Sequence, residues 1–385
     1  MDSFFVECER LRDPSLSGKP VVVGGGGNRG VVASASYEAR RAGVHSAQAM
    51  AQARRMCPKL VVVPTDHGFY RSVSASVFTI LRSITPLVEG LSVDEAFLDV
   101  SGLTRHYQSA TLIAQEVRER VGTEVGIPSS AGVAATKFMA KLASTSAKPD
   151  GLLHVPVESQ LEFLHALNVR ALWGVGEAAH AALERVGVQT VGELADLDVA
   201  TLQRLLGPSA GAHLAALARG EDQRPVIAAS DAKSISAEQT YGTDLHDPAL
   251  IRTEVLRHAT RVAARLRQAG VAGRTVTLKL RFHDFDTPSR TLTLTSATDV
   301  TRDLHRAALQ LLERMPRRGE GVRLLGVGVS HLEPRDAPRQ LATDRPAKWD
   351  DLEDAVETVR LKYGEDSVGP AVLRSESDDE GRQKS

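Results

Sequence analysis

Apolar and polar residues alternate strictly in one stretch of this chain, "TVTLKLRF" (275–282). Val276, Leu278, Leu280 and Phe282 alternate there with threonine, lysine and arginine, which predicts a strand with one buried and one polar face. The patterns around it predict strands near 233–240, 289–296 and 322–332, and helices over 248–269 and 299–315. This β-α-β-β-α-β order predicts a compact unit over residues 233–334.

The first 155 residues mix shorter strands with amphipathic helices. Their patterns predict strands within 19–33 and at 59–64, 87–102 and 129–135, and helices at 34–56, 68–84, 109–121 and 136–147. The opening "MDSFF" is apolar and aromatic around one acid, as if inside a buried strand. Together these patterns predict an α+β domain over residues 1–155.

Residues 156–222 change to short, glycine-punctuated helices. The stretch "LWGVG" contains a turn with Gly174 and Gly176, directly before a predicted helix. Backbone N–H groups in such a turn suit a phosphate oxygen, although a plain corner between two helices has the same pattern. The polar residues 223–232, which include Pro225, predict a linker.

Charge is distributed unevenly behind a net value of −1. Residues 230–340 carry 18 Lys and Arg against 13 Asp and Glu, whereas residues 341–385 carry 7 against 12. The first segment is typical of a nucleic-acid-binding module, although a solvated sheet face would also be polar. We expect residues 335–385 to form an acidic, largely flexible tail with one helix at 349–363.

Composition argues against several other classes of protein. No apolar run approaches 18 residues and no basic, then apolar leader opens the chain, so we expect neither a membrane span nor a secretory signal. Cys8 and Cys57 are too few for a disulfide framework and indicate buried thiols in a reducing cytoplasm. We therefore expect a cytoplasmic protein.

The segment "SVDEAFLDV" (92–100) carries two adjacent acids between apolar flanks. Asp94 and Glu95 occupy the predicted position of a two-residue hairpin turn, where glutamate is unfavourable. Neighbouring carboxylates repel unless a cation lies between them, and such oxygen ligands suit Mg²⁺. Two such ions can drive in-line displacement at phosphorus, and Asp2 is the sequence candidate for a third acid. Solvated acids in a turn are the alternative interpretation.

Two further stretches offer groups that could bind a triphosphate. In "SASYEARR", Ser34, Tyr37 and Arg40 follow one another at i, i+3 spacing and would share one face of a helix. The stretch "KFMAKLASTSAKPDG" supplies three lysines, of which Lys148 precedes a proline that ends the helix. Each stretch alone is more typical of an amphipathic helix with solvated cations.

These stretches together resemble one known family. The segments "DSFF", "ASYEAR", "SVDEAFLDV", "AGVAATKFMAKLAS" with "AKPDG", and "LWGVG" are similar in order and spacing to Y-family translesion DNA polymerases of the bacterial DNA polymerase IV branch. The resemblance covers residues 1–335. It implies a right-hand architecture with palm and fingers in 1–155 (fingers about 10–60), a helix-hairpin-helix thumb in 156–222 and a little finger in 233–334.

The resemblance also implies roles for single residues. Asp94 and Glu95 match palm ligands of two Mg²⁺ ions, and Glu95 is the acid usually called catalytic. Phe5 matches the aromatic steric gate that excludes ribonucleotides. The residues expected to bind the incoming nucleotide are Phe4, Ser34, Tyr37, Arg40 and Lys148, and those expected to bind DNA are Gly174, Gly176, Lys233, Lys279 and Arg281.

The implied function is template-directed DNA synthesis by a low-fidelity translesion polymerase without proofreading. Its expected partners are primer-template DNA and deoxynucleoside triphosphates, and we expect a monomer. The stretch "RQLATD" (339–344) lies where relatives carry a peptide for the sliding clamp, but it lacks the usual Leu-Phe anchors. Clamp binding through Gln340 and Leu341 therefore stays open.

The chain departs from the family pattern at its start. The family has Asp-x-Asp-x-Phe-Phe, in which Asp2 matches the second acid and the first acid, a metal ligand, has no counterpart before Met1. We expect the chain as written to be poorly active, and the codons upstream of Met1 to encode an apolar stretch ending in Asp. The alternatives are a catalytically impaired, polymerase-like DNA-binding accessory protein, and a helix-hairpin-helix DNA-repair nuclease, which would not explain the little finger.

Overall fold

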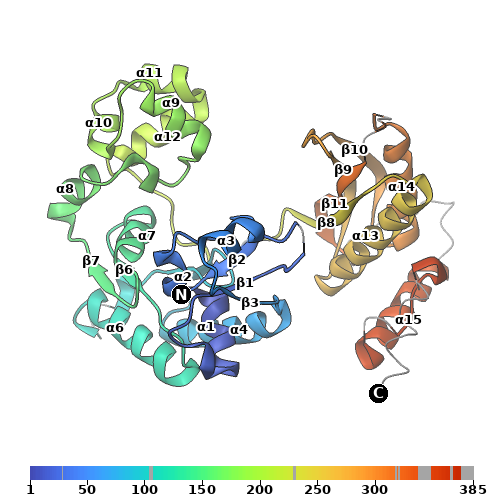
Figure 1. Cartoon of the computed structure of the whole chain (residues 1–385), viewed down its shortest axis with the longest axis horizontal. Coiled ribbons are helices and arrows are strands. Elements are labelled where there is room, and N and C mark those ends of the chain that lie inside the picture. Colours follow the sequence, from blue (N-terminus) through green and yellow to red (C-terminus); the bar gives the residue numbers. More distant parts are fainter. Residues whose placement is uncertain are drawn as a thin grey trace. The chain divides into compact units, whose positions relative to one another are not determined.

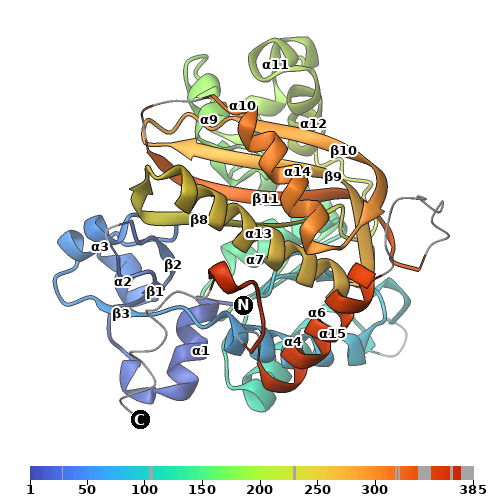
Figure 2. The same cartoon turned by 90° about the vertical axis from the view of Figure 1, so that its right-hand side faces the viewer.

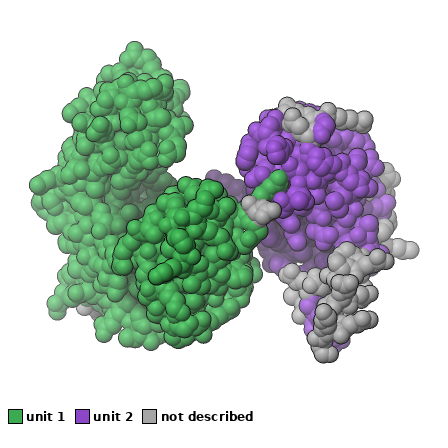
Figure 3. Space-filling model, in the orientation of Figure 1, with its two compact units in different colours: residues 1–230 green, residues 231–385 purple. Residues whose placement is uncertain are grey.

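The computed structural model describes residues 1–373 apart from 28, 104–106, 229–230, 317–318, 320, 337–347 and 365–366. The chain divides into two compact units, residues 1–230 and residues 231–385 (Figure 1, Figure 3). Each unit has its own hydrophobic core residues. The segment 339–344, considered above for clamp binding, lies outside the described residues.

None of the described helices combines the length and the apolar composition needed to cross a lipid bilayer.

The first residues form a helix, so the expectation of a strand at the start is wrong. Helix α1 (Phe4–Arg12) follows Ser3, whose backbone is left-handed at φ 46°. Phe4 and Cys8 lie one helical turn apart on α1, and both are buried in the core. An apolar run this short does not distinguish a buried strand from a buried helix, and packing against α4 (His67–Ile84) decides the outcome.

A three-stranded sheet follows, in the order β2-β1-β3. Strand β1 (Val21–Gly24) is antiparallel to β2 (Val32–Ala35) and parallel to β3 (Val61–Val63). The strands predicted within 19–33 and at 59–64 are confirmed, whereas the parallel pairing of β1 with β3 was not predicted. The single helix expected over 34–56 is wrong, because this stretch forms β2 and two short helices, α2 (Tyr37–Arg41) and α3 (Met50–Met56). Gly43, at φ 82°, takes the left-handed conformation that interrupts a helix.

The elements between residues 67 and 155 form two separate two-stranded sheets with helices around them (Figure 1). They are α4, β4 (Val88–Gly90), β5 (Ala96–Leu98), α6 (Ala110–Arg120), β6 (Ala131–Val133), α7 (Lys137–Ser146) and β7 (Leu152–His154). Strands β4 and β5 are antiparallel, whereas β6 and β7 are parallel. The elements predicted for this region are confirmed, and the expected two-residue turn between β4 and β5 is a connection of residues 91–95 instead.

A bundle of short helices occupies residues 160–218 (Figure 1). It consists of α8 (Gln160–His165), α9 (Glu177–Glu184), α10 (Val191–Ala195), α11 (Val199–Leu206) and α12 (Pro208–Ala218). Leucines from all five helices meet in one core, among them Leu164, Leu183, Leu194, Leu202 and Leu214. The helical character predicted for 156–222 is confirmed.

Residues 234–334 form a four-stranded antiparallel sheet in the order β10-β9-β11-β8. The elements are β8 (Ser234–Leu245), α13 (Pro248–Gln268), β9 (Val271–Phe282), β10 (Ser289–Thr298), α14 (Thr301–Glu313) and β11 (Val322–Pro334). Helices α13 and α14 cover one face of the sheet (Figure 2). The predicted β-α-β-β-α-β order is confirmed, and the four alternating apolar residues Val276, Leu278, Leu280 and Phe282 of β9 are all 2% exposed or less.

Helix α15 (Lys348–Tyr363) extends this second unit, as predicted for 349–363. Glu353 and Glu357 on α15 form ion pairs of 3.0 and 3.3 Å with Arg267 of α13. The Arg267 side chain is 2% exposed, so these carboxylates compensate a buried charge. The last stretch, 374–385, lies outside the described residues.

Candidate active site

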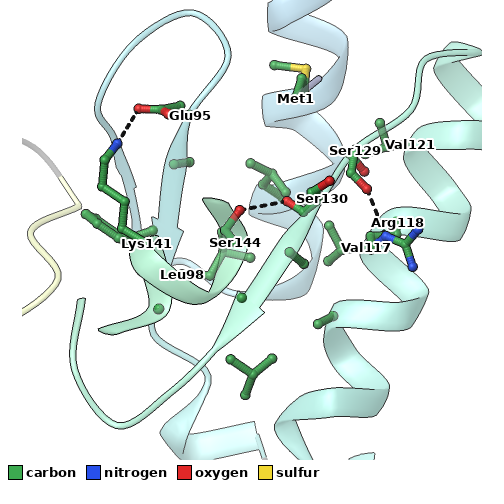
Figure 4. Close-up of a pocket in the computed structure, with 18 of the residues that line it drawn as sticks. Met1, Glu95, Leu98, Val117, Arg118, Val121, Ser129, Ser130, Lys141 and Ser144 are labelled. Carbon is green, nitrogen blue, oxygen red and sulfur yellow. Dashed lines mark hydrogen bonds and ion pairs between the residues drawn. The ribbon is translucent and has the colours of Figure 1, made fainter. Parts of the chain in front are cut away.

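The two adjacent acids lie on the connection between β4 and β5. The backbone N–H of Leu91 donates to the carbonyl oxygen of Glu95 at 2.9 Å, which closes this connection. The Ser92 hydroxyl donates to Asp94 Oδ1 at 2.6 Å, and Lys141 Nζ of α7 lies 2.6 Å from Glu95 Oε2 (Figure 4). Both carboxylates are therefore oriented by neighbours, and Glu95 is oriented by a cation from another element.

Positive charge surrounds these carboxylates. Burial disfavours the ionised form of Glu95, but its hydrogen bond and charge attraction to Lys141 outweigh burial and lower the pKa of Glu95. The α-ammonium of Met1 donates to the backbone carbonyl of Asp94 at 2.6 Å. Burial lowers the pKa of this ammonium, while the Asp94 carboxylate opposes the shift. The loop thus presents negative charge to cations.

The chemistry of this donor set fits a divalent ion. Asp94 and Glu95 supply the carboxylate oxygens that Mg²⁺ prefers, and two cationic groups already lie against the same loop. No three Asp, Glu, His or Cys side chains in the described part of the chain gather closely enough to hold a metal ion. The structure therefore brings together two of the three expected acids.

Asp2 has a different role from the one expected of a third acid. Its side chain is buried, and its Oδ2 accepts hydrogen bonds from the Ser130 hydroxyl at 2.6 Å and from the Asp150 backbone N–H at 2.7 Å. Its Oδ1 has no hydrogen-bond partner among the described residues and lies 3.9 Å from Lys148 Nζ. The expectation that Asp2 joins Asp94 and Glu95 in one cluster is wrong, because its carboxylate anchors the chain around residues 130 and 150.

Phe5 lies on an aromatic support that the sequence did not indicate. Its ring stacks on Tyr70 of α4 with centroids 4.4 Å apart and planes at 16°, and the His67 ring meets Phe5 edge-on at 5.9 Å. The Tyr70 hydroxyl donates to Glu9 Oε1 at 2.6 Å. Burial, followed by this hydrogen bond, raises the pKa of Tyr70. The sequence pattern does not indicate these contacts, because His67 and Tyr70 lie 61 or more positions from their partners on α1.

Phe4 differs from Phe5 although the two are adjacent. The Phe4 side chain is 3% exposed and belongs to the core, and its expected contact with a nucleotide stays a prediction. Phe5 is half-buried. Successive residues of a helix point about 100° apart, which explains why one ring enters the core and the other reaches its edge.

The residues expected to bind the triphosphate come from three segments. Ser34 is buried in β2, so the expected helical face shared by Ser34 and Tyr37 is wrong. Tyr37 begins α2 and Arg40 lies on the same helix, with its guanidinium 4.6 Å from the Tyr37 ring. Burial, and then the Asp2 carboxylate, raise the pKa of Tyr37. Asp2 is thus a common neighbour of Tyr37 and Lys148.

A cavity of about 250 Å³ opens beside the acids (Figure 4). Its polar lining includes Met1, Asp94, Glu95, Lys141 and Lys148. The remaining wall is mostly apolar and comes largely from α4, β5, α6, β6 and α7. The acids and Lys148, which are far apart in sequence, therefore line one cavity.

The candidate DNA contacts of the first unit lie at the start of α9. Gly174 has φ 106°, a conformation that side chains rarely adopt, and Gly176 is the N-cap residue of α9. The turn therefore needs glycine at Gly174 and exposes backbone N–H groups at a helix N-terminus. Phosphate binding at this turn stays a prediction.

The candidate DNA contacts of the second unit lie on or beside its sheet. Lys279 and Arg281 share the polar face of β9, and the exposed Lys233 directly precedes β8. Lys279 Nζ lies 2.9 Å from Glu238 Oε2, across Gly326 of β11. A Cβ at Gly326 would lie 2.7 Å from Glu238 Cβ, so glycine is what permits this cross-strand pair. The pair reduces the positive charge that the sequence predicts for this face.

Comparisons with known proteins agree with this geometry. Residues 1–145 match the impB/mucB/samB family, residues 232–343 match the C-terminal domain of that family, and residues 170–222 match the thumb domain of DNA polymerase iota. A chimera of Y-family DNA polymerases has a TM-score of 0.77 at 23% identity, over 86% of this chain and 96% of the chimera. This likeness shows the right-hand fold, with palm, fingers, thumb and little finger.

Two curated relatives define the family more closely. DNA polymerase IV of Streptomyces coelicolor is 46% identical over 350 residues, which cover 90% of this chain and 73% of that protein. DNA polymerase IV of Alkalilimnicola ehrlichii is 46% identical over 349 residues, which cover 89% of this chain and 97% of that protein. The chain belongs to the DNA polymerase IV family of Y-family polymerases.

Proposed function

We propose that this protein adds deoxynucleotides to a DNA primer under the direction of a template, as a low-fidelity translesion polymerase without proofreading. The observation that carries the proposal is that Asp94, Glu95 and Lys148 line a single cavity. Paired carboxylates beside a lysine suit a metal-bound triphosphate. Membership of the DNA polymerase IV family supports primer-template DNA and deoxynucleoside triphosphates as the substrates.

In the proposed reaction, the primer 3′-oxygen forms a bond to the α-phosphorus of the nucleotide. The bond between this phosphorus and the pyrophosphate oxygen breaks, and the primer hydroxyl releases its proton to water. Asp94 and Glu95 would hold two Mg²⁺ ions, which polarise phosphate oxygens and favour ionisation of the primer hydroxyl when bound. Lys148 and Arg40 supply positive charge for the pyrophosphate that leaves.

Phe5 is proposed to select the sugar. An aromatic ring leaves less room for a 2′-hydroxyl than a small side chain does, and stacking on Tyr70 holds this ring in place. Tyr37 and Ser34 are proposed to contribute further contacts to the triphosphate. Ser34 is buried in this structure. A contact between Ser34 and the triphosphate therefore requires the triphosphate to lie directly against β2.

We further propose domain roles that follow the same family. Residues 1–155 form palm and fingers, 156–222 the thumb, 223–232 the linker and 233–334 the little finger. Gly174 and Gly176 are proposed to contact the duplex backbone through their N–H groups, and Lys233, Lys279 and Arg281 through charge. The separate family matches over residues 1–145, 170–222 and 232–343 support this division.

Primer extension by Asp94→Ala and Glu95→Ala tests the proposal. We expect each variant to lose about a thousandfold or more in extension rate, because the acids would act on charge that develops in the reaction. Binding of primer-template DNA, measured on the same preparations, should persist. Glu124→Ala is the matched control, since Glu124 is an exposed acid that pairs with Arg120 and does not line the cavity. Near-normal extension by either test variant would remove the acids from the mechanism.

A second candidate function is a catalytically impaired DNA-binding accessory protein. One observation favours it, namely that the described residues hold no cluster of three metal-binding side chains. The same experiment separates the two functions. If the wild-type chain binds primer-template DNA but extends primers no faster than Glu95→Ala does, the accessory function is supported and the polymerase function is rejected.

A further inference from the structure

Trp173 is an exposed aromatic residue that contacts two cations. It lies in the segment before α9, and it is 40% exposed, which is unusual for so large an apolar side chain. Lys141 Nζ lies 5.3 Å and Arg224 Cζ 5.2 Å from its ring. Cations within about 6 Å of an indole ring are attracted to its π face. The ring therefore joins α7 to the segment after α12.

Lys141 connects this ring to the acid Glu95. Its Nζ lies 2.6 Å from Glu95 Oε2, and Figure 4 shows the lysine extending from α7 to the β4–β5 connection. The two side chains are 29% and 39% exposed, and ion pairs this exposed contribute little to stability. The structural consequence of the pair is orientation, because it restricts where the Glu95 carboxylate can point.

The other cation, Arg224, is connected to α7 through Asp222. Arg224 Nε donates to Asp222 Oδ1 at 2.6 Å, and its Nη2 donates to Asp222 Oδ2 at 3.0 Å. Asp222 Oδ2 also accepts the backbone N–H of Phe138, in the first turn of α7, at 3.2 Å. The contacts thus form a closed circuit that starts at the N-terminus of α7 and returns to Lys141 one turn later.

We propose that Lys141 is a positioning residue for Glu95 and that Trp173 fixes Lys141. The placement of the segment before α9 then determines the orientation of Glu95. This inference rests on the role given to Glu95 under the proposed function. It needs no contact between Lys141 and a substrate, and it explains why a tryptophan stays exposed at this position.

Steady-state primer extension by the full chain tests the role of Lys141. We expect Lys141→Met to lower kcat about tenfold while KM for the nucleotide changes by less than about twofold, because a misplaced reacting group slows the step that follows binding. Lys141→Arg keeps the charge and should retain most of the activity. Trp173→Leu should lower kcat in the same direction, and Trp173→Phe, which keeps an aromatic face, should lower it less.

A second readout is independent of activity. Trp173 and Trp349 are the only tryptophans in the chain, so in a Trp349→Phe background the fluorescence reports Trp173 alone. Lys141→Met should change its intensity or emission maximum, because a cation leaves the ring. Lys59→Met is the control, since Lys59 is an exposed lysine shortly before β3 and is not one of the two cations on the Trp173 ring. It should leave the fluorescence unchanged.

The possible outcomes separate this inference from the proposed function. Normal kcat and unchanged fluorescence in Lys141→Met would overturn the inference, even if Glu95→Ala is inactive. A raised KM with unchanged kcat would also overturn it, because Lys141 would then bind the nucleotide itself. Normal activity in Glu95→Ala would reject the proposed function, whatever Lys141→Met does. Equal kcat in Glu95→Gln and in the double variant Glu95→Gln/Lys141→Met would support the coupling, because Lys141 would then have no effect once the Glu95 carboxylate is gone.

Discussion

Replacing Asp2 tests how the start of the chain supports the site. Asp2 is 1% exposed, and its Oδ2 accepts two hydrogen bonds, from the Ser130 hydroxyl at 2.6 Å and the Asp150 N–H at 2.7 Å. Its Oδ1 also lies 3.9 Å from Lys148 Nζ. Asp2→Ala would leave both donors without their partner and would free the segment that carries Lys148.

The magnitude follows from these contacts. Hydrogen bonds to a charged group each stabilise a fold by roughly 1.5–3 kcal/mol, so two of them amount to about 3–6 kcal/mol. Removing the carboxylate also removes the cost of burying a charge, which offsets part of that loss, and a net destabilisation of about 3 kcal/mol is expected. Asp2→Asn keeps the shape and one acceptor oxygen, so its cost should be nearer 1 kcal/mol.

Urea unfolding of the full chain measures this loss. In a Trp349→Phe background, Trp173 fluorescence follows the first unit, which contains Asp2. A double-mutant cycle with Ser130→Ala should give a coupling of about 1–2 kcal/mol. The nucleotide KM should rise in Asp2→Ala because Lys148 loses its support. A destabilisation below about 0.5 kcal/mol, the level of an ordinary surface substitution, would refute the reasoning.

Three further predictions follow from other parts of the molecule. Phe5→Val should raise the ratio of ribonucleotide to deoxyribonucleotide efficiency by about tenfold or more, since the selection is steric; an unchanged ratio would assign the gate to another residue. His258 is fully buried, and burial lowers its pKa to about 4. As the pH falls, this histidine therefore binds a proton in the unfolded chain before it does so in the folded one. Its contribution to the free energy of unfolding is complete above about pH 6.5 and falls by roughly 3 kcal/mol toward pH 4. His258→Leu should flatten this pH dependence in urea unfolding. Arg281→Gln should reduce the slope of log binding constant against log salt concentration by about one. Lys279→Gln should reduce it by less, because Glu238 already pairs with that lysine. Equal slopes in the wild type and both variants would exclude this face from DNA binding.

Local patterns were sufficient for most secondary structure. In β9, the two-residue period of Val276, Leu278 and Leu280 matches the geometry of a strand, so the buried face could be predicted from the sequence. The stretch 34–56 shows the limit of such patterns. Its alanines favour a helix over the whole stretch. It is divided into a strand and two helices because β2 pairs with β1 and because Gly43 takes the left-handed conformation.

The sequence by itself determined the β-α-β-β-α-β unit, the adjacent acids Asp94 and Glu95, and the family that the ordered motifs resemble. Only the tertiary structure decided which groups those residues meet. The pair between Lys141 and Glu95 spans 46 positions, and the hydrogen bond from Tyr70 to Glu9 spans 61. Periodicity indicates which face of a helix or strand is buried, whereas the residue that this face contacts depends on how distant segments of the chain pack. For the same reason the sequence could name Asp2 as an acid of interest, but the fold turned its carboxylate inward to hold Ser130 and Asp150.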